Sequence, residues 1–380
     1  DGIRDDLVTG VQTCALPICM DKLRLMSESA RGEGGRVWVP KQKGDKRAAR
    51  SIPESERWYF LEERYPKYKN LVPRDVASRE IHNVCVDLGM GIDGGMAVYL
   101  DLTHIPRETL KKKLEGILEI YEKFTGDDPC DEPMKIYPAV HYSMGGLWAD
   151  YERTSEGFLN LSSPRNQSTN VPGLYAVGEC DYQYHGANRL GANSLLSCVY
   201  AGQVAGPAVL AYLGGLKGAG ETPSSLLDAA EGRWTARFDE LSKREGTENP
   251  YQIAEELGKW MLENVTIVRH NDKLRATDAK IQELQERWRR ASVLDHGQWA
   301  NAPLSFLNQL WNMLHLARVV TLGALARDES RGAHYKPDFP KRDDANWLKS
   351  TVASFSPEGP RFRYDPVDVS LYSPVERKYD

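Results

Sequence analysis

The sequence of 380 residues is poor in features that mark several protein classes. It has no uninterrupted apolar run of the roughly 18 residues that a membrane span needs, and the nearest candidate, 195–213, is rich in Gly and Ala. Its six cysteines form no CxxC pair and no metal-ligand spacing with histidine, so we expect no metal site. The net charge of −5 argues against a general nucleic-acid binder.

The beginning of the chain lacks a recognisable targeting segment and a dinucleotide-binding turn. Residues 1–19 have neither the cationic region nor the apolar core of a signal peptide. Because residues 8–18 resemble translated adapter sequence, we expect 1–19 to be a foreign leader. Residues 89–94 fit GxGxxG literally, but the fingerprint needs a strand before it and a helix after it. Here a helix-like segment comes before residues 89–94 and a strand-like segment comes after them, so we expect a loop.

The most informative segment present is HGANRLGANSLLS at 185–197. It places Arg189 beside a small-residue turn that opens an apolar helix over 195–213, which we expect to be buried. The first turn of a helix has four amides without helical partners, so this end is predicted to face a ligand. Asn193 and Ser194 are suitable capping residues.

A second segment, VPGLYAVGEC at 171–180, predicts a turn, a short strand over 174–177 and a Gly-Glu pair at the strand's end. Ligands of open α/β sheets bind at such ends. Together with ARGEGG at 30–35 and AVHYSMGG at 139–146, these segments resemble the flavoprotein subunit of succinate dehydrogenase and fumarate reductase. The segment YFLEE at 59–63 and others resemble the Bacillus-like branch of that family most closely.

The resemblance begins near residue 21 and implies a fold class and a division into domains. The fold is expected to be α/β with an α+β cap: a partial FAD-binding Rossmann-like domain, a capping domain, a helical bundle and an irregular carboxyl-terminal domain. Members of the family open with a Gly-rich βαβ unit that this sequence lacks, so the resemblance implies an amino-terminally truncated chain, inactive by itself. The expected domains after the leader are 20–140 for the cap, 141–220 for the FAD-binding part, 221–329 for the helical domain and 330–380 for the carboxyl-terminal domain.

The resemblance also assigns the residues that act on the substrate. Arg31 is the expected catalytic proton carrier, although arginine is a poor base by residue type because its pKa exceeds about 12. His141 and Arg189 are expected to bind the two carboxylates of a dicarboxylate, and Arg189 offers a planar, permanently charged fork for that purpose. His185, Arg331 and His334 are expected to be structural.

FAD is the cofactor that the resemblance implies. Glu179 is expected to accept hydrogen bonds from the ribityl hydroxyls. Asn193, Ser194 and Leu195 are expected to contribute the start of the helix, whose amides stabilise negative charge on the reduced flavin.

The resulting hypothesis is a flavoprotein subunit of a succinate:quinone oxidoreductase. It implies an iron-sulfur subunit and a cytochrome b membrane anchor as partners, and a peripheral position at the cytoplasmic side of the cell membrane. Two alternatives stay open: an aspartate oxidase-like flavoenzyme, and a non-catalytic fragment that binds a partner subunit.

Overall fold

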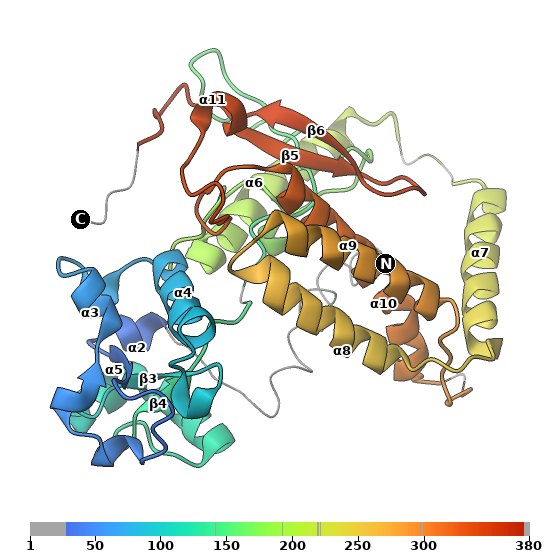
Figure 1. Cartoon of the computed structure of the whole chain (residues 1–380). Helices are drawn as coiled ribbons and strands as arrows, with labels where there is room; N and C mark the ends of the chain where they lie inside the picture. The colour runs from blue at the N-terminus through green and yellow to red at the C-terminus, as the bar shows by residue number, and fades with distance from the viewer. Residues whose placement is uncertain are drawn as a thin grey trace. The chain divides into compact units, whose positions relative to one another are not determined.

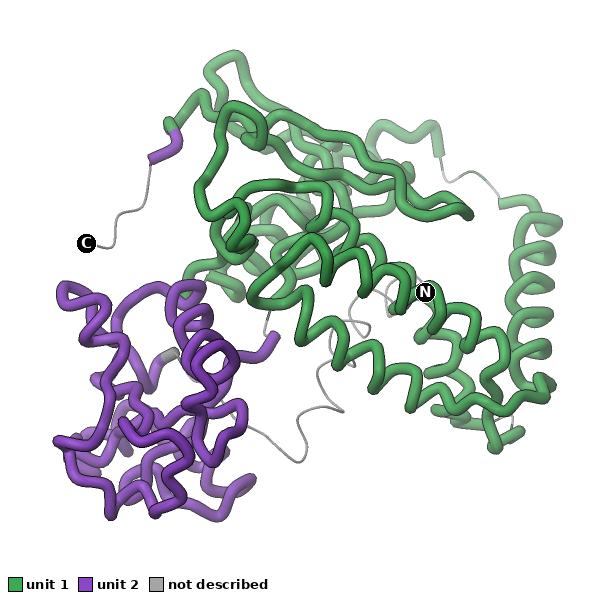
Figure 2. Tube along the Cα trace, in the orientation of Figure 1, with its two compact units in different colours: residues 1–17, 142–373 green, residues 18–141, 374–380 purple. Residues whose placement is uncertain are grey.

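The computed structural model describes residues 28–140, 142–191, 193–218, 220, 222–297 and 299–375. The chain divides into two compact units, one over 18–141 with 374–380 and one over 1–17 with 142–373 (Figure 2). Helices and strands occur in both units, which confirms a mixed helix and sheet fold. The expected leader, 1–19, lies outside the described residues, and the finer division of 142–373 into three domains stays a prediction.

The unit that ends at residue 141 is built on a four-stranded antiparallel sheet in the order β2-β1-β3-β4 (Figure 1). Its strands and main helices are β1 (Arg36–Pro40), β2 (Arg57–Trp58), β3 (Val98–Asp101), β4 (Met134–Ile136), α2 (Glu28–Gly32), α3 (Phe60–Arg64), α4 (Arg74–His82) and α5 (Arg107–Thr125). The loop expected at 89–94 is confirmed, since it contains only a short 3-10 turn and leads into β3.

Helix α5 shows why this unit folds as it does. Its buried residues recur every three or four positions, which places them on one face of the helix. The helix ends at Gly126, whose left-handed backbone (φ 79°) lets its amide cap the carbonyl of Glu122. These buried residues are Leu110, Leu114, Leu118 and Tyr121.

The second unit contains the helices expected after residue 220. They are α7 (Ser224–Lys243), α8 (Pro250–Met261), α9 (Asn271–Trp288) and α10 (Ala302–Ala326). All four contribute to one hydrophobic core, and the indole of Trp288 in α9 donates a 2.7 Å hydrogen bond to the carbonyl of Leu307 in α10. Asn249 and Asn301 cap the starts of α8 and α10, each followed by proline within the first turn.

The carboxyl-terminal part is less irregular than the sequence predicted. After α11 (Asp344–Trp347), strands β5 (Lys349–Ser354) and β6 (Arg361–Pro366) form an antiparallel hairpin. The ring of Phe362 lies 3.6 Å from the position of a Cβ on Gly323, so the hairpin packs against α10 at this glycine.

Helix α6 (Asn193–Gly215) is a helix as expected, and the described residues bury it along one stripe only. Its buried residues form a stripe of mostly small side chains, among them Ser197, Ala201 and Ala208, while Leu195 and Leu210 are 77 % and 71 % exposed. The described residues cover only the small-residue stripe, so the opposite apolar face lies open. Of the described helices, α6 is the one whose length and composition would allow it to cross a membrane, a test that core helices also pass.

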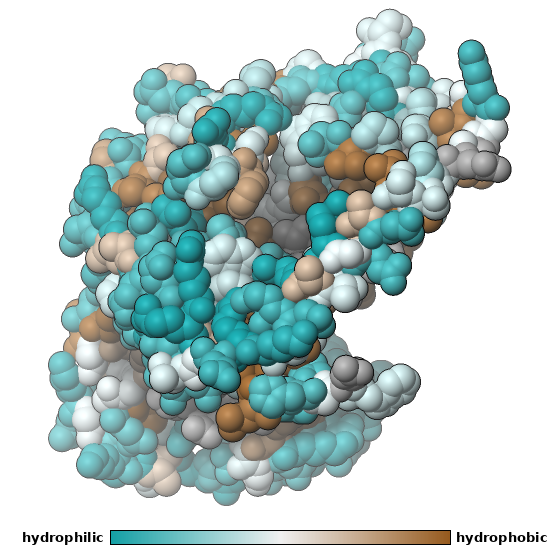
Figure 3. Space-filling view, turned by 90° about the vertical axis from the view of Figure 1, so that its right-hand side faces the viewer, coloured by the Kyte–Doolittle hydropathy of each residue, from teal (hydrophilic) through white to brown (hydrophobic). Residues whose placement is uncertain are grey.

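Two further expectations about the segment before α6 are wrong. Residues 174–177 form no strand, because Tyr175 makes only an isolated antiparallel bridge to Ser168 and the chain then turns into a 3-10 helix, η7 (Gly178–Cys180). Asn193 is the first residue of α6 and not a cap before it. Elsewhere, the face drawn in Figure 3 shows separate groups of hydrophobic residues among hydrophilic ones.

The loop before β3 supplies a test of the fold. A Cβ on Gly91 would lie 1.8 Å from the carbonyl oxygen of Gly95, so Gly91→Ala should destabilise the sheet-containing unit by about 1–3 kcal/mol. Gly116→Ala is the matched control, because Gly116 is exposed in the middle of α5 with open space around it and alanine favours the helix by about 1 kcal/mol. Hydrogen exchange of the β1 and β3 amides in urea measures both. Equal stability of the two variants would contradict the close contact.

Candidate functional site

The turn η7 lies directly against the first turns of α6. Gly178 has a left-handed backbone (φ 74°), and the position of a Cβ on it is 3.1 Å from the sulfur of Cys198. Two independent reasons therefore favour glycine at 178: the backbone conformation and the lack of space. The contact brings Glu179 close to the helix start at Asn193, Ser194 and Leu195.

Glu179 is held at the surface by the loop that follows residue 141. Its Oε1 accepts a 2.9 Å hydrogen bond from the backbone amide of Ser143, and its side chain remains exposed. A Cβ on Gly146 would lie 2.4 Å from the carbonyl oxygen of Cys180, so the Gly-Gly turn packs tightly against η7. The exposed carboxylate and the amides at the start of α6 form a polar surface with both acceptors and donors.

Arg189 is almost fully buried, with 6 % of its surface exposed. Its guanidinium lies 4.8 Å from the ring centre of Tyr142, and its Nη1 donates a 3.2 Å hydrogen bond to the carbonyl of Leu190. An aromatic face attracts a cation through its negative π surface. The arrangement holds the guanidinium in place beside the Tyr142 ring.

A small polar cluster lies beside Arg189. Nε2 of His185 is 3.2 Å from both the hydroxyl of Tyr142 and the hydroxyl of Ser197 in α6. Burial and the nearby charge of Arg189 lower the pKa of His185, and burial raises the pKa of Tyr142. His185 is therefore neutral at pH 7, and it links the 142 loop to α6.

The segment around residues 331–334 fixes the other side of the Arg189 loop. The amide of Ala333 donates a 2.9 Å hydrogen bond to the carbonyl of Ala187, and a Cβ on Gly332 would lie 2.4 Å from that same oxygen. Arg331 forms ion pairs with Glu329 and Asp344. Burial lowers the pKa of His334 to about 3. Both side chains fit the structural roles expected for them.

Arg31 lies in the other unit, at the end of α2, and is 3 % exposed. Its Nη1 donates hydrogen bonds to two backbone carbonyls, those of Asn70 at 2.6 Å and Val72 at 2.5 Å. Glu33, a possible partner by sequence, instead pairs with Lys113 of α5. The guanidinium is therefore positioned by main-chain oxygens from the segment before α4.

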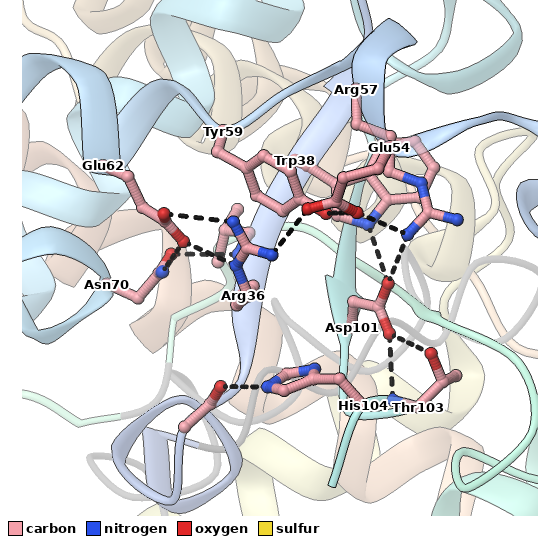
Figure 4. Close-up of polar contacts among 12 residues, drawn as sticks. Arg36, Trp38, Glu54, Arg57, Tyr59, Glu62, Asn70, Asp101, Thr103 and His104 are labelled. Carbon is pink, nitrogen blue, oxygen red and sulfur yellow. Dashed lines mark hydrogen bonds and ion pairs between the residues drawn. The ribbon is translucent and has the colours of Figure 1, made fainter.

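Asn70 in turn is fixed by a charged network within the same unit (Figure 4). Its Oδ1 accepts a hydrogen bond from the amide of Val37, and its Nδ2 donates to Glu62. Hydrogen bonds from Arg36 lower the pKa of Glu62, which stays ionised. Sequence reasoning missed Asn70, because it positions Arg31 through its main chain and lies 39 residues away.

The structure thus places the predicted residues in two groups and leaves one out. Glu179, Arg189 and the start of α6 are held by neighbouring segments of one unit, and Arg31 belongs to the other. His141 lies outside the described residues. The described part of the chain contains no group of three or more His, Cys, Asp or Glu that could hold a metal ion. Tyr142 and Ser197 are contacts that sequence reasoning did not identify.

The comparisons with known families and proteins agree with one another. Residues 3–195 match the family described as FAD binding domain, and residues 254–379 match the fumarate reductase flavoprotein C-terminal family. The chain is 55 % identical over 362 residues to the succinate dehydrogenase flavoprotein subunit of Bacillus subtilis, covering 94 % of this chain and 57 % of that protein. It is 34 % identical to the fumarate reductase flavoprotein subunit of Escherichia coli, covering 93 % and 56 %.

Solved structures give the same result. A variant of the E. coli quinol fumarate reductase has a TM-score of 0.78 at 32 % identity, with 93 % of this chain and 57 % of that chain covered. The Mycobacterium smegmatis Sdh1 complex with UQ1 has a TM-score of 0.65 at 27 % identity, with 91 % and 52 % covered. The chain spans little more than half the length of these relatives.

Asp181, directly after η7, gives the site a pH-dependent stability. Its side chain is buried, and burial raises its pKa to about 6, against a value near 4 in an unfolded chain. The unfolded state therefore releases this proton first, so this group's contribution to stability is full below pH 4 and is lost as the pH rises to about 6.

We expect Asp181→Asn to abolish this pH-dependent loss of stability. The loss amounts to about 3 kcal/mol, because the pKa differs by about two units between the folded and the unfolded state. Urea unfolding between pH 4 and 7 measures it. Asp128→Asn is the control with the opposite sign, because hydrogen bonds from the Cys130 amide and Arg107 lower the pKa of Asp128. If the Asp181→Asn protein keeps the wild-type slope, Asp181 is not the responsible group.

Proposed function

This chain belongs to the FAD binding domain family of flavoproteins, and on that premise we propose that it acts in a succinate:quinone oxidoreductase, oxidising succinate to fumarate. The similarity to the B. subtilis succinate dehydrogenase flavoprotein subunit, 55 % identity over 94 % of the chain, is the observation that carries the proposal. The proposal also includes the division into domains: a capping domain, part of a Rossmann-like FAD-binding domain, a helical domain and a carboxyl-terminal domain.

The residues around η7 fit the ribityl and pyrimidine parts of FAD. Glu179 presents an exposed carboxylate, oriented by the Ser143 amide, that can accept hydrogen bonds from ribityl hydroxyls. The first turn of α6, over Asn193, Ser194 and Leu195, presents backbone amides that favour negative charge. When bound there, FAD would supply the acceptor for a hydride from succinate.

The chain's own side chains would bind the dicarboxylate and carry the proton. Arg189 would hold one carboxylate with its planar fork, while the Tyr142 ring keeps that fork in place. His141 would hold the other carboxylate. Arg31 would accept, in the neutral form of its guanidine, the proton from the carbon next to the one that loses the hydride, and its hydrogen bonds to the carbonyls of Asn70 and Val72 hold the side chain in place.

The partners and location follow from the same family. We propose an iron-sulfur subunit as electron acceptor and a cytochrome b subunit as membrane anchor, with the chain on the cytoplasmic side of the membrane. The solved relatives include quinol fumarate reductase and an Sdh1 complex. Co-purification with the two proposed subunits tests this part.

The role of Arg31 can be tested in a chimera in which this chain replaces the matching part of the B. subtilis subunit. Arg31→Lys should reduce kcat at least a hundredfold and leave malonate affinity within about threefold, because a lysine cannot reproduce both carbonyl contacts. Arg50→Lys, an exposed arginine of the same unit, is the control. A normal kcat with a raised KM would show that Arg31 only binds substrate.

Arg189 should contribute mainly to binding. In the same chimera, Arg189→Ala should weaken malonate binding by about 2–5 kcal/mol, as expected for loss of a desolvated charge-assisted pair. Arg189→Lys should recover only part of it, since an ammonium group cannot bind a carboxylate bidentately. Arg165→Ala is the control, because Arg165 is an exposed residue paired with Asp150. Unchanged malonate affinity in Arg189→Ala would remove this residue from the site.

A further inference from the structure

The main-chain segment that binds Arg31 is itself held by a side chain. The two carbonyls that accept hydrogen bonds from Arg31 belong to Asn70, within the 3-10 turn η4 (Lys69–Leu71), and to Val72, which follows it. We propose that Asn70 and Glu62 are positioning residues, which act through this segment on the guanidine of Arg31 and thereby set kcat. The inference rests on the proposed function, in which Arg31 accepts the proton.

The two ends of the segment are held in different ways. Val72 is fully buried, so apolar packing holds its end, whereas Leu71 is 64 % exposed and contributes little to packing. Asn70 is 8 % exposed, although its side chain is polar. The place of the Asn70 carbonyl therefore depends on what the side chain of the same residue binds.

The amide group of Asn70 joins the turn to a strand and a helix. Its Oδ1 accepts a 2.9 Å hydrogen bond from the backbone amide of Val37 in β1, and its Nδ2 donates a 2.8 Å hydrogen bond to Oε1 of Glu62 in α3. A main-chain amide can only donate and an ionised carboxylate can only accept, so the two partners together fix which end of the Asn70 amide faces each of them. Neither an aliphatic side chain nor an ionised carboxylate can replace both contacts.

Glu62 is in turn fixed by Arg36 of β1. Nε of Arg36 donates a 2.8 Å hydrogen bond to Oε1 of Glu62, and Nη2 donates a 3.2 Å hydrogen bond to Oε2 (Figure 4). The guanidinium carbon of Arg36 also lies 3.7 Å from the ring centre of Tyr59, and its Nη1 donates to Glu54. The hydrogen bonds from Arg36 lower the pKa of Glu62. The acceptor that holds the Asn70 amide is therefore ionised at pH 7, and such a bond is stronger than one between neutral groups.

A displaced Arg31 should change the rate of the reaction and not the binding of the substrate. Proton transfer requires the guanidine within hydrogen-bond reach of the reacting group, and small misplacements slow such a step steeply. The proposed function assigns the dicarboxylate to His141 and Arg189. A variant that only unfolds part of the protein lowers the amount of bound FAD, so kcat measured per bound FAD separates misplacement from a loss of folded enzyme.

Two variants of the chimera described above test the proposal. Asn70→Ala should lower kcat per bound FAD by about tenfold to a hundredfold and leave malonate affinity within about threefold. Glu62→Gln keeps an oxygen acceptor for the Asn70 amide and loses only the charge, so kcat should fall by about threefold to tenfold. Wild-type kcat in both variants would overturn the proposal.

Leu71→Ala and Glu63→Gln are the matched controls. Leu71 lies between the two carbonyls with an exposed side chain, and Glu63 is the exposed neighbour of Glu62 in α3 and accepts a hydrogen bond from the indole of Trp58. Both variants should keep the wild-type kcat. A loss in Leu71→Ala as large as that in Asn70→Ala would overturn the proposal, because any change in the turn would then suffice.

A double-mutant cycle tests whether Asn70 acts through Arg31. In the Arg31→Lys chimera, Asn70→Ala should add little to the loss of kcat, because a lysine cannot make both carbonyl contacts. The same loss in both backgrounds would show that Asn70 acts by another route and would overturn the proposal.

Hydrogen exchange of the full chain gives a readout that needs no turnover. Asn70→Ala should speed the exchange of the Val37 amide by about tenfold or more, and Leu71→Ala should leave it unchanged. Unchanged exchange in Asn70→Ala would overturn the contact itself. Arg31→Lys with a wild-type kcat would overturn the proposed role of Arg31 and this inference together, whereas a slow Arg31→Lys beside a fully active Asn70→Ala would overturn this inference alone.

Discussion

The close contact between η7 and α6 is the constraint on which the candidate site depends. It exists because Gly178 combines a left-handed backbone with no side chain, so that the turn reaches the sulfur of Cys198. A larger residue would strain the backbone and push the turn away from the helix. The contact places η7, which contains the exposed Glu179, against α6.

Two arginines illustrate two ways of positioning a guanidinium. Arg189 rests on the ring of Tyr142, and Arg31 is held by two main-chain carbonyls. In both cases the contacts described fix the direction of the guanidinium.

Local patterns predicted the elements well where a single segment decides the outcome. The loop at 89–94 and the helical character of the segment after residue 220 were both predicted from the sequence. The prediction of a strand at 174–177 failed because a strand needs a partner along its whole length, and Tyr175 finds one at a single position. The hairpin β5–β6 was missed because it packs against α10, which lies outside its own segment of the chain.

The sequence by itself determined the helices, the family and which charged residues are candidates for the site. These depend on local spacing and on motifs that are continuous in the chain. Only the tertiary structure decided which face of α6 is covered and which carbonyls hold Arg31. These facts join residues that are far apart along the chain or depend on which surfaces become buried. The hydrophobic effect favours the burial of apolar surface, but it is non-directional and does not determine which part of the chain covers that surface.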